Sequence, residues 1–306
     1  MPEPAVWSLQ QLVHELPERA VIWTTPSVRD IVATTLRRPI VDVAAGFPVD
    51  VDTVVVVGGG TLLDHAKRER HLHALHVRLI AVPSLWGSGA EASPIVVTTH
   101  PDHKEVSIDP GFLPDVRVAW PELAASAPAH LLRYGCGDTW AHALEGFLCP
   151  LATDDLRVEL AGIMRELLAL PIGNDGRWFD VSARACAAQA RSGVGLTHGI
   201  AHVLEPVLRA AQPTAGWGHA RLCSAFLSPV LGLFVSVSDK VQTLTAAYDV
   251  DLTAVESAVR SVFSQEDYAA CLPALAECWP RILRDPCTRT SCVLIRPSYL
   301  SFFRGD

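Results

Sequence analysis

The sequence is poor in charged residues and in basic clusters. Only 19% of its 306 residues are charged, against 49% that are hydrophobic, and the formal net charge is −8. Globular chains usually carry about 25% charged residues, so the deficit indicates further burial in an oligomer, and we expect a homodimer. The basic cluster K-R-E-R at residues 67–70 is typical of a solvated helix face. The composition therefore argues against nucleic acid as a partner.

Several other signatures are missing. The eight cysteines form no Cys-x-x-Cys pair and have no regular spacing, which argues against a zinc ribbon or a disulfide framework and favours reduced core cysteines. The N-terminal segment has an acidic residue at position 3 and no basic region followed by an apolar one. No apolar run approaches the ~20 residues that span a membrane. We therefore expect a soluble, cytoplasmic protein with no membrane partner.

Strand-like and helix-like segments alternate in the first part of the chain. Apolar, β-branched runs occur at residues 20–23, 54–57 and 79–82, and a helical stretch at residues 62–70 separates the last two. Continuous apolar strands separated by helices predict a parallel sheet covered on both faces. We therefore predict a doubly wound α/β domain over residues 1–120, the fold class that includes dinucleotide-binding domains.

The character changes from residue 121 onward. Segments rich in alanine and leucine follow, for example residues 154–168, 181–190 and 252–263, and strand signals become rare. This pattern predicts a helical bundle over residues 121–306. Ligands commonly bind in the cleft between two such domains, so we expect the site there.

Two glycine-rich segments follow predicted strands. Residues 54–67, V-V-V-V-G-G-G-T-L-L-D-H-A-K, bring three glycines to the start of a helix, where backbone N–H groups and the helix dipole favour a phosphate. The spacing is not G-x-G-x-x-G, so a tight turn without a ligand remains an alternative. Residues 83–93 form the second segment. Open α/β sheets bind ligands at the carboxyl ends of their strands, so both segments are candidate binding loops.

Acidic and imidazole side chains recur at helical spacing in apolar segments. Asp138 and His142 are four residues apart, as are His198 and His202, and His219 precedes another helical run. Side chains four residues apart share one helical face. Burying them unpaired would be costly, and a divalent iron or zinc ion is a suitable partner for imidazole and carboxylate groups. The spacing therefore predicts a metal site.

The glycine-rich segments resemble two motifs of the iron-containing alcohol dehydrogenases, whose relatives include glycerol dehydrogenases and dehydroquinate synthases. Residues 58–67 are similar to the family's G-G-G-S-x-x-D-x-A-K, with Asp64 and Lys67 at the corresponding positions. Residues 83–91, P-S-L-W-G-S-G-A-E, are similar to its P-T-T-x-G-T-G-S-E.

The histidine-containing segments resemble the same family. Residues 137–145 are similar to its G-x-D-A-x-x-H-x-x-E, and residues 195–202 and 218–219 fall where its remaining histidines belong. The resemblance is collinear from residue 54 to residue 231 and weaker on both sides. It implies a short, divergent member with a nucleotide domain followed by a helical domain.

The resemblance also implies a role for each motif. Asp138, His142, His198 and His219 would hold a ferrous ion, with zinc as an alternative, and His202 would lie beside the substrate as the catalytic proton donor. The chain would be an NAD(P)-linked alcohol dehydrogenase or aldehyde reductase, interconverting a small aldehyde and a primary alcohol by hydride transfer. The residues implied to contact NADP(H) or NAD(H) are Gly58, Gly59, Gly60, Thr61, Asp64, Ser84, Leu85, Ser88 and Thr24.

The sequence also departs from the family pattern. Ser84, Leu85 and Ala90 replace Thr, Thr and Ser in the second loop. The first strand ends in Thr24 and Thr25, where NAD-preferring members often have an acid, so NADP(H) is expected to be tolerated. The altered loop leaves open a protein that binds metal or nucleotide without hydride transfer. A sugar-phosphate cyclase is less favoured, because the lysines that grip a phosphorylated sugar acid are not found.

Overall fold

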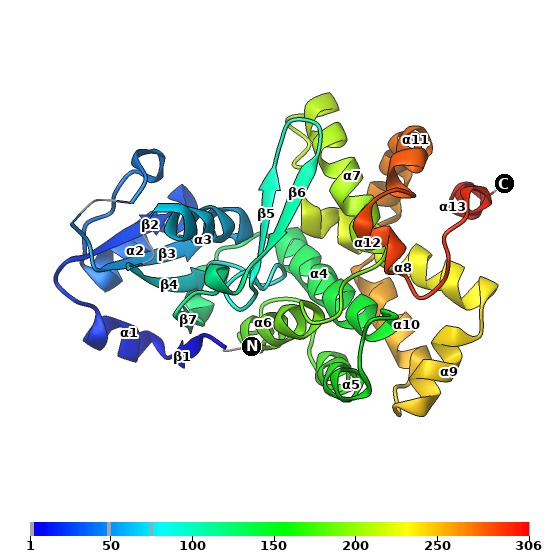
Figure 1. Ribbon diagram of the computed structural model, residues 1–306, viewed down its shortest axis with the longest axis horizontal. Coiled ribbons are helices and arrows are strands. Elements are labelled where there is room, and N and C mark those ends of the chain that lie inside the picture. The colour runs from blue at the N-terminus through cyan, green and yellow to red at the C-terminus, as the bar shows by residue number, and fades with distance from the viewer. Residues whose placement is uncertain (1–2, 48–49, 74–75, 306) are drawn as a thin grey trace. The chain divides into compact units, whose positions relative to one another are not determined.

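The computed structural model describes residues 3–47, 50–73 and 76–305. The chain divides into two compact units, which are labelled element by element in Figure 1. The first unit contains residues up to 98 together with 105–128 and 174–187. The second contains residues 99–104, 129–173 and those from 188 onward.

A parallel sheet forms the centre of the first unit. Its five strands lie in the order β1 (Ala5–Trp7), β7 (Val116–Val118), β4 (Arg78–Pro83), β3 (Thr53–Gly58) and β2 (Ala20–Thr24). Every neighbouring pair is parallel, and Val55 of β3 lies opposite Ile22 of β2 and Ile80 of β4. The predicted parallel sheet is thus confirmed.

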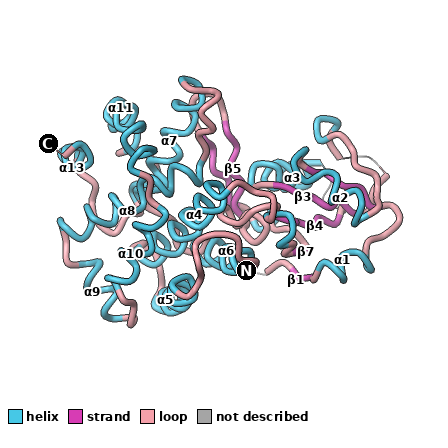
Figure 2. The backbone as a smooth tube through the Cα atoms, turned by 180° about the vertical axis from the view of Figure 1, so that it is seen from behind, coloured by secondary structure: helices cyan, strands magenta, loops and turns pink. Residues whose placement is uncertain are grey.

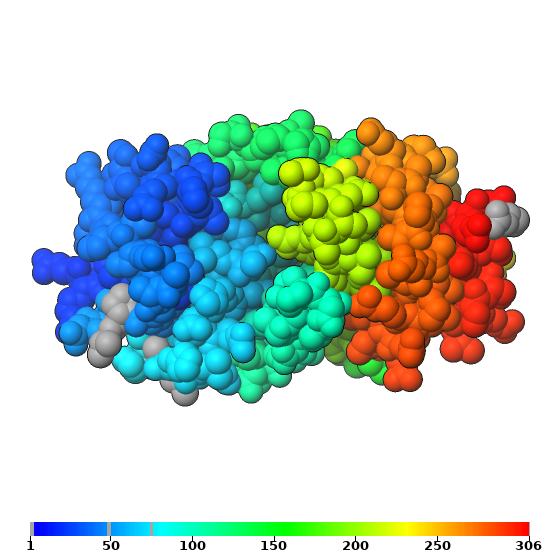
Figure 3. Space-filling model, turned by 90° about the horizontal axis from the view of Figure 1, so that it is seen from above, coloured from blue at the N-terminus to red at the C-terminus, as the bar shows by residue number. Residues whose placement is uncertain are grey.

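Helices cover both faces of this sheet (Figure 1). Val55 and Val57 of β3 belong to a core that includes residues of α1 (Leu9–Glu15) and α2 (Arg29–Leu36). Val54 and Val56 belong to a second core with residues of α3 (Gly60–His73). Successive side chains of a strand point to opposite faces, so a strand buried on both faces needs an uninterrupted apolar run. The four consecutive valines at residues 54–57 meet this need. Figure 3 shows the outer surface of the molecule, with the N-terminal segments of this unit in blue.

The first unit also contains α6 (Arg177–Gln189) through residue 187, which the predicted boundary near residue 120 had assigned to the helical part. Trp178 and Phe179 of α6 pack against Trp86 of the second glycine-rich loop, and the Ser182 hydroxyl accepts a hydrogen bond from Gly87 N at 2.9 Å. The unit extends to residue 128 before the helical unit begins. Helical periodicity shows that α6 has a buried face, but it does not show which of the two units that face packs against.

A two-stranded hairpin of β5 (Ile95–Thr99) and β6 (Lys104–Ile108) was not expected from the sequence. Its turn, residues 99–104, groups with the second unit. There, Lys104 forms an ion pair with Glu205, and both side chains are only 6% exposed. The hairpin turn therefore brings a buried cation into the helical unit.

Helices dominate the second unit, as predicted (Figure 2). Its centre is formed by α4 (Ala129–Leu148), α7 (Leu196–Ala211) and α8 (His219–Val237), which pack against one another. A Cβ atom on Gly137 of α4 would lie 2.0 Å from Ser224 Oγ of α8, so this glycine permits the close approach of the two helices. The remaining helices are α5 (Asp154–Leu168), α9 (Lys240–Ala247), α10 (Leu252–Val262), α11 (Gln265–Ile282), α12 (Pro286–Arg289) and α13 (Leu300–Arg304).

Among the described helices, α8 alone is long and apolar enough to cross a membrane, with a mean hydropathy of 1.7 over its most apolar window. The expectation that no such segment exists therefore needs correction. Leu222, Phe226 and Leu233 of α8 are buried, and the helix packs between α4 and α7. Its composition is thus explained by its position in the core of the unit.

Candidate metal centre and nucleotide turn

Three helices of the second unit present the predicted metal-binding residues. Asp138 and His142 come from α4, His198 and His202 from α7, and His219 is the first residue of α8. The four residues of α4 and α7 are buried, and His219 is partly exposed. Residues more than 80 positions apart in the sequence thus lie together in the core of one unit.

The separations between donor atoms suit a single ion. Asp138 Oδ1 lies 3.9 Å from His142 Nε2 and 3.7 Å from His219 Nε2. The ring of His198 has its centroid 4.7 Å from that of His142 and 5.2 Å from that of His219. One donor atom each from Asp138, His198, His219 and Cys223 lies within 4.8 Å of the others. Donors bound at ~2.0–2.3 Å to a common ion must lie within about 4.6 Å of one another, so little movement would be needed.

Unpartnered polar atoms support the same conclusion. Asp138 Oδ1, His142 Nδ1, His198 Nε2 and His219 Nδ1 are buried and have no hydrogen-bond partner among the described residues. Buried polar atoms in folded proteins are nearly always satisfied, because an unpaired one costs about 1–3 kcal/mol. A divalent cation would supply the missing partner for Asp138 Oδ1 and His198 Nε2. The donor set therefore fits a metal ion.

The charge state of the cluster also suits metal binding. Burial lowers the pKa of His142, His202 and His219 well below its ordinary value, and the Lys104 ammonium lowers the last two further. These imidazoles are therefore neutral at neutral pH, which is the form that binds a metal. Burial raises the pKa of Asp138, although the neighbouring His198 opposes the shift.

Glu145 fixes the orientation of His198. Its Oε2 accepts hydrogen bonds from His198 Nδ1 at 2.7 Å, Gly195 N at 2.9 Å and His198 N at 3.3 Å, and its Oε1 accepts one from Thr197 N at 2.6 Å. Burial acts to raise the pKa of Glu145, but the hydrogen bond from His198 and the backbone bonds hold that pKa below its ordinary value. An ionised Glu145 keeps the proton on His198 Nδ1, so the lone pair of Nε2 is available to a metal. The sequence motif contained Glu145 without indicating this role.

His202 lies beside the donor set and outside it. Its ring stacks on that of His219 at a centroid distance of 5.3 Å, and its Nδ1 lies 3.5 Å from Cys287 Sγ. Together with Asp285 and Cys287 it forms a separate group of potential ligands, in which Asp285 caps α12 by accepting a hydrogen bond from Cys287 N. The structure therefore groups His202 with Asp285 and Cys287, apart from the group of Asp138, His198, His219 and Cys223.

In the first unit, the glycine turn contacts the second glycine-rich loop. A Cβ atom on Gly60 would lie 2.7 Å from Ser88 Oγ, and Ser84 N donates to Gly58 O at 2.9 Å. No atom lies within 4 Å of the position where Gly59 would carry a Cβ, and α3 begins at the next residue. This arrangement leaves room for an anion at a helix N-terminus. The other predicted contact residues that are not fully buried are Thr24, Thr61, Ser84, Leu85 and Ser88.

Asp64 does not have the exposure expected of a nucleotide contact. Its Oδ1 accepts a hydrogen bond from Lys67 Nζ at 3.1 Å, and its Oδ2 accepts one from Val97 N at 3.0 Å. Lys67 is fully buried and also donates to Ala90 O at 3.0 Å. We therefore correct the role of Asp64: it and Lys67 brace α3 against the second loop and the hairpin, which satisfies two groups that burial would otherwise destabilise.

Comparison with known proteins points to one family. Residues 38–121 match the family model described as iron-containing alcohol dehydrogenase. The solved iron-containing alcohol dehydrogenase from Thermococcus thioreducens superposes with a TM-score of 0.74 at 19% identity and covers 99% of both chains. That from Corynebacterium glutamicum gives a TM-score of 0.78 at 20% identity, over 98% of this chain and 93% of the other. Residues 38–121 thus resemble the iron-containing alcohol dehydrogenases in sequence, and the chain as a whole shares the fold of their solved structures.

The curated relatives match over shorter stretches. The 1-propanol dehydrogenase of Citrobacter freundii is 29% identical over 168 residues, which are 50% of this chain and 45% of that protein. The maleylacetate reductase of Sphingobium indicum is 33% identical over 145 residues, which are 45% of this chain and 38% of that protein. The matched region thus spans less than half of the length of each of these two relatives.

The structure adds residues at the candidate metal centre that sequence reasoning did not single out. Cys223 lies one turn after His219 on α8 and joins the donor set. Lys104 and Glu205 form their buried ion pair in the same unit, and the Lys104 ammonium influences the pKa of His202. The spacing of Cys223 could have revealed it, because it repeats the four-residue interval of the two predicted pairs. The position of Lys104 depends on the hairpin turn and had no sequence signal.

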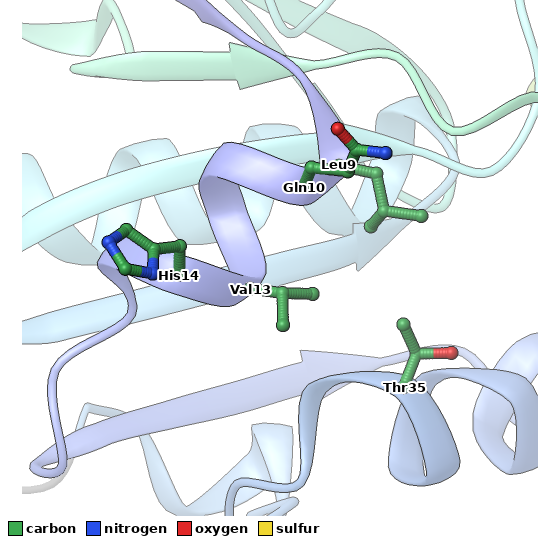
Figure 4. A pocket seen from close by; sticks show the side chains of 5 residues that line it. All are labelled: Leu9, Gln10, Val13, His14 and Thr35. Carbon is green, nitrogen blue, oxygen red and sulfur yellow. The ribbon is translucent and has the colours of Figure 1, made fainter.

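A surface depression of the first unit is lined by side chains of α1 and α2 (Figure 4). It contains none of the predicted site residues. The imidazole of His14 at its edge is exposed and has no acid, thiol or second imidazole among the lining residues, which are Leu9, Gln10, Val13, His14 and Thr35. The depression therefore gives no indication of a catalytic or metal site.

Proposed function

We propose that the protein is a metal-dependent oxidoreductase that interconverts a small aldehyde and a primary alcohol by hydride transfer with NADP(H) or NAD(H). The observation that carries the proposal is the convergence of the Asp138 carboxylate with the imidazoles of His142, His198 and His219. Each of these four side chains has a buried atom with no hydrogen-bond partner among the described residues. A relative of this chain is a 1-propanol dehydrogenase, whose name specifies a primary alcohol. An uncharged substrate of that class suits a site in which burial lowers the pKa of His142 and His219 and keeps both rings neutral.

The residues of α4, α7 and α8 would hold the ion, iron in the first instance and zinc as an alternative. Asp138, His142, His198 and His219 are the ligands of the proposal, and Glu145 keeps His198 in the ligating tautomer. When bound, such an ion supplies Lewis-acid polarisation of a carbonyl oxygen. The Asp138 carboxylate offsets part of the ion's charge, which lowers the cost of holding the ion in a buried site.

His202 would manage the proton of the hydroxyl group. Because burial and Lys104 hold its pKa below the ordinary histidine value, the ring is neutral at neutral pH. A neutral imidazole can donate from one nitrogen and accept at the other. Cys287 Sγ lies beside Nδ1, which leaves Nε2 as the nitrogen that would exchange a proton with the alcohol oxygen. This assigns acid–base work to a residue outside the donor set.

The glycine turn would bind the pyrophosphate of the nucleotide. Its open position at Gly59 and the N-terminus of α3 provide space and a favourable dipole for an anion. Thr24 ends β2 with a neutral side chain, so a 2′-phosphate would meet no fixed negative charge from this residue. NADP(H) is therefore included in the proposal.

The proposal can be tested with purified protein in two steps. Metal analysis should find about one iron or zinc ion per chain, in line with a single four-ligand centre. A panel of short aldehydes, assayed by loss of NADPH and NADH absorbance, should then show turnover that a chelator abolishes and added metal restores. Turnover that survives complete removal of the metal would refute the proposal. Stoichiometric metal with no turnover on any aldehyde would support a protein that binds metal without hydride transfer.

A further inference from the structure

Cys223 repeats the spacing of the metal-binding pairs. It follows His219 by four residues on α8, as His142 follows Asp138 on α4. Side chains at this interval share one face of a helix, so the face of α8 that presents His219 to the cluster also presents Cys223. The metal-binding pattern of α8 is therefore a histidine and a thiol.

The distances place the sulfur among the donors. Cys223 Sγ lies 3.6 Å from His219 Nε2 and within 4.8 Å of donor atoms of Asp138 and His198. The residue is fully buried. Two further buried atoms of the same set, Asp138 Oδ1 and His198 Nε2, have no hydrogen-bond partner among the described residues. A thiol is only a weak hydrogen-bond donor, so it does not remove the need for a cation at this point.

We propose that Cys223 supplies a sulfur ligand to the ion held by Asp138, His198 and His219, in the position that the proposed function gives to His142, which is not one of the four residues of this donor group. The inference rests on the proposed metal-dependent function and changes its first-choice ion from iron to zinc. Binding would release the thiol proton to solvent, because the thiolate is the ligating form. Sulfur ligands favour zinc, whereas imidazole suits iron and zinc alike, so the mixed set selects zinc over ferrous iron.

The other described cysteines provide controls. Cys271 is fully buried in α11 and belongs to neither potential ligand group, so Cys271→Ser tests the general cost of removing a buried thiol. Cys287 lies beside His202 in the neighbouring group and is the alternative source of sulfur. Cys287→Ser therefore distinguishes the two thiols.

Cobalt(II) absorbance provides a direct test on the full-length chain. The metal-free protein loaded with Co²⁺ should show visible ligand-field bands and a near-ultraviolet thiolate-to-cobalt charge-transfer band. Cys223→Ser should keep the visible bands and lose the near-ultraviolet band, whereas Cys271→Ser and Cys287→Ser should keep both. Loss of a residue that hydrogen-bonds to a metal ligand typically lowers metal affinity ~10–100-fold. Cys223→Ser removes a proposed ligand itself, so its affinity for Zn²⁺ should fall by at least this factor. Its affinity for Fe²⁺ should change less.

The outcomes separate this inference from the proposed function. Visible bands without the near-ultraviolet band in the wild type would overturn the sulfur ligand and leave the metal site intact. Loss of the near-ultraviolet band in Cys287→Ser alone would assign the sulfur to the neighbouring group and overturn the role of Cys223. Failure to bind cobalt or zinc at all would overturn both proposals.

A measurement on the wild type covers the case in which Cys223→Ser does not fold. X-ray absorption of the zinc-loaded protein should show a sulfur shell at ~2.3 Å in addition to nitrogen and oxygen ligands at ~2.0–2.2 Å. A first shell of nitrogen and oxygen alone would refute the proposal.

Discussion

Replacing Glu145 by Gln tests whether the metal centre depends on a fixed histidine tautomer. The carboxylate accepts four hydrogen bonds, three at Oε2 and one at Oε1. An amide can accept at one position only. If its oxygen occupies the Oε2 position, its NH₂ group faces the Thr197 N–H. If it is turned over, the NH₂ group faces His198 Nδ1, which must then give up its proton to Nε2, where that proton would block the lone pair.

The expected loss of metal affinity is worked out for the less damaging orientation, in which the amide oxygen occupies the Oε2 position. One buried N–H loses its acceptor, which costs about 1–3 kcal/mol, and the charge of the remaining acceptor is lost. Substitution of a partner of this kind typically lowers metal affinity about 10–100-fold, which is about 1.4–2.8 kcal/mol at tenfold per 1.4 kcal/mol. We therefore expect Glu145→Gln to bind zinc or iron about 10–100-fold more weakly.

Competition against a chelator of known affinity measures this loss without reference to activity. Glu159→Gln is a matched control, because Glu159 is a half-exposed glutamate of the same unit that pairs with Arg191. Unchanged metal affinity in Glu145→Gln would refute the tautomer argument. An equal loss in the Glu159 variant would show that the effect is not specific to His198.

Three further outcomes are expected. His202→Ala should keep its metal but lose turnover by about 10²–10⁴-fold, measured as kcat beside metal content; loss of the metal as well would make His202 a ligand. Thr24→Asp should shift the kcat/KM ratio toward NADH, because a carboxylate repels the 2′-phosphate; NADPH binding too weak to detect in the wild type would contradict this. The metal-free protein should lose stability as pH falls through the ordinary histidine range, because the lowered pKa of His142, His202 and His219 means that the unfolded chain binds more protons; urea midpoints that do not change with pH would contradict this.

The grouping of the candidate metal ligands was largely predictable because its information is local. The pairs Asp138 and His142, and His198 and His202, occupy one face of a helix wherever that helix packs, so spacing alone showed that they point together. Glu145 and Cys223 obey the same periodicity, but a glutamate or a cysteine on a helix has many structural uses. Only the contacts with His198 and His219 distinguish the roles that they have here.

The contacts around the glycine turn could be predicted only in part from the local sequence. The valine run and the three glycines predicted the strand, the turn and the helix, and the structure has all three. The direction in which Asp64 points was not predictable, because Val97 N reaches it from a hairpin whose position beside α3 has no local sequence signal. The place of α6 in the first unit was hidden for the same reason, since its partners are Trp86 and Gly87 of a distant loop.

The crossing of α4 and α8 brings the candidate ligands of the two helices together in one cluster. Asp138 can meet His219 only if α4 and α8 approach closely at their crossing, and Gly137 permits this because a Cβ atom there would lie 2.0 Å from Ser224 Oγ and 3.0 Å from Ser224 Cα. Gly137 is thus a glycine for a steric reason, and it directly precedes Asp138, the predicted carboxylate ligand. The residue that permits the helix packing and the candidate ligand are therefore neighbours in the sequence. A helix of this composition could display Asp138 and His142 without forming a metal centre. The crossing with α8 brings Asp138 to His219, and the same face of α8 brings the thiol of Cys223 to the cluster.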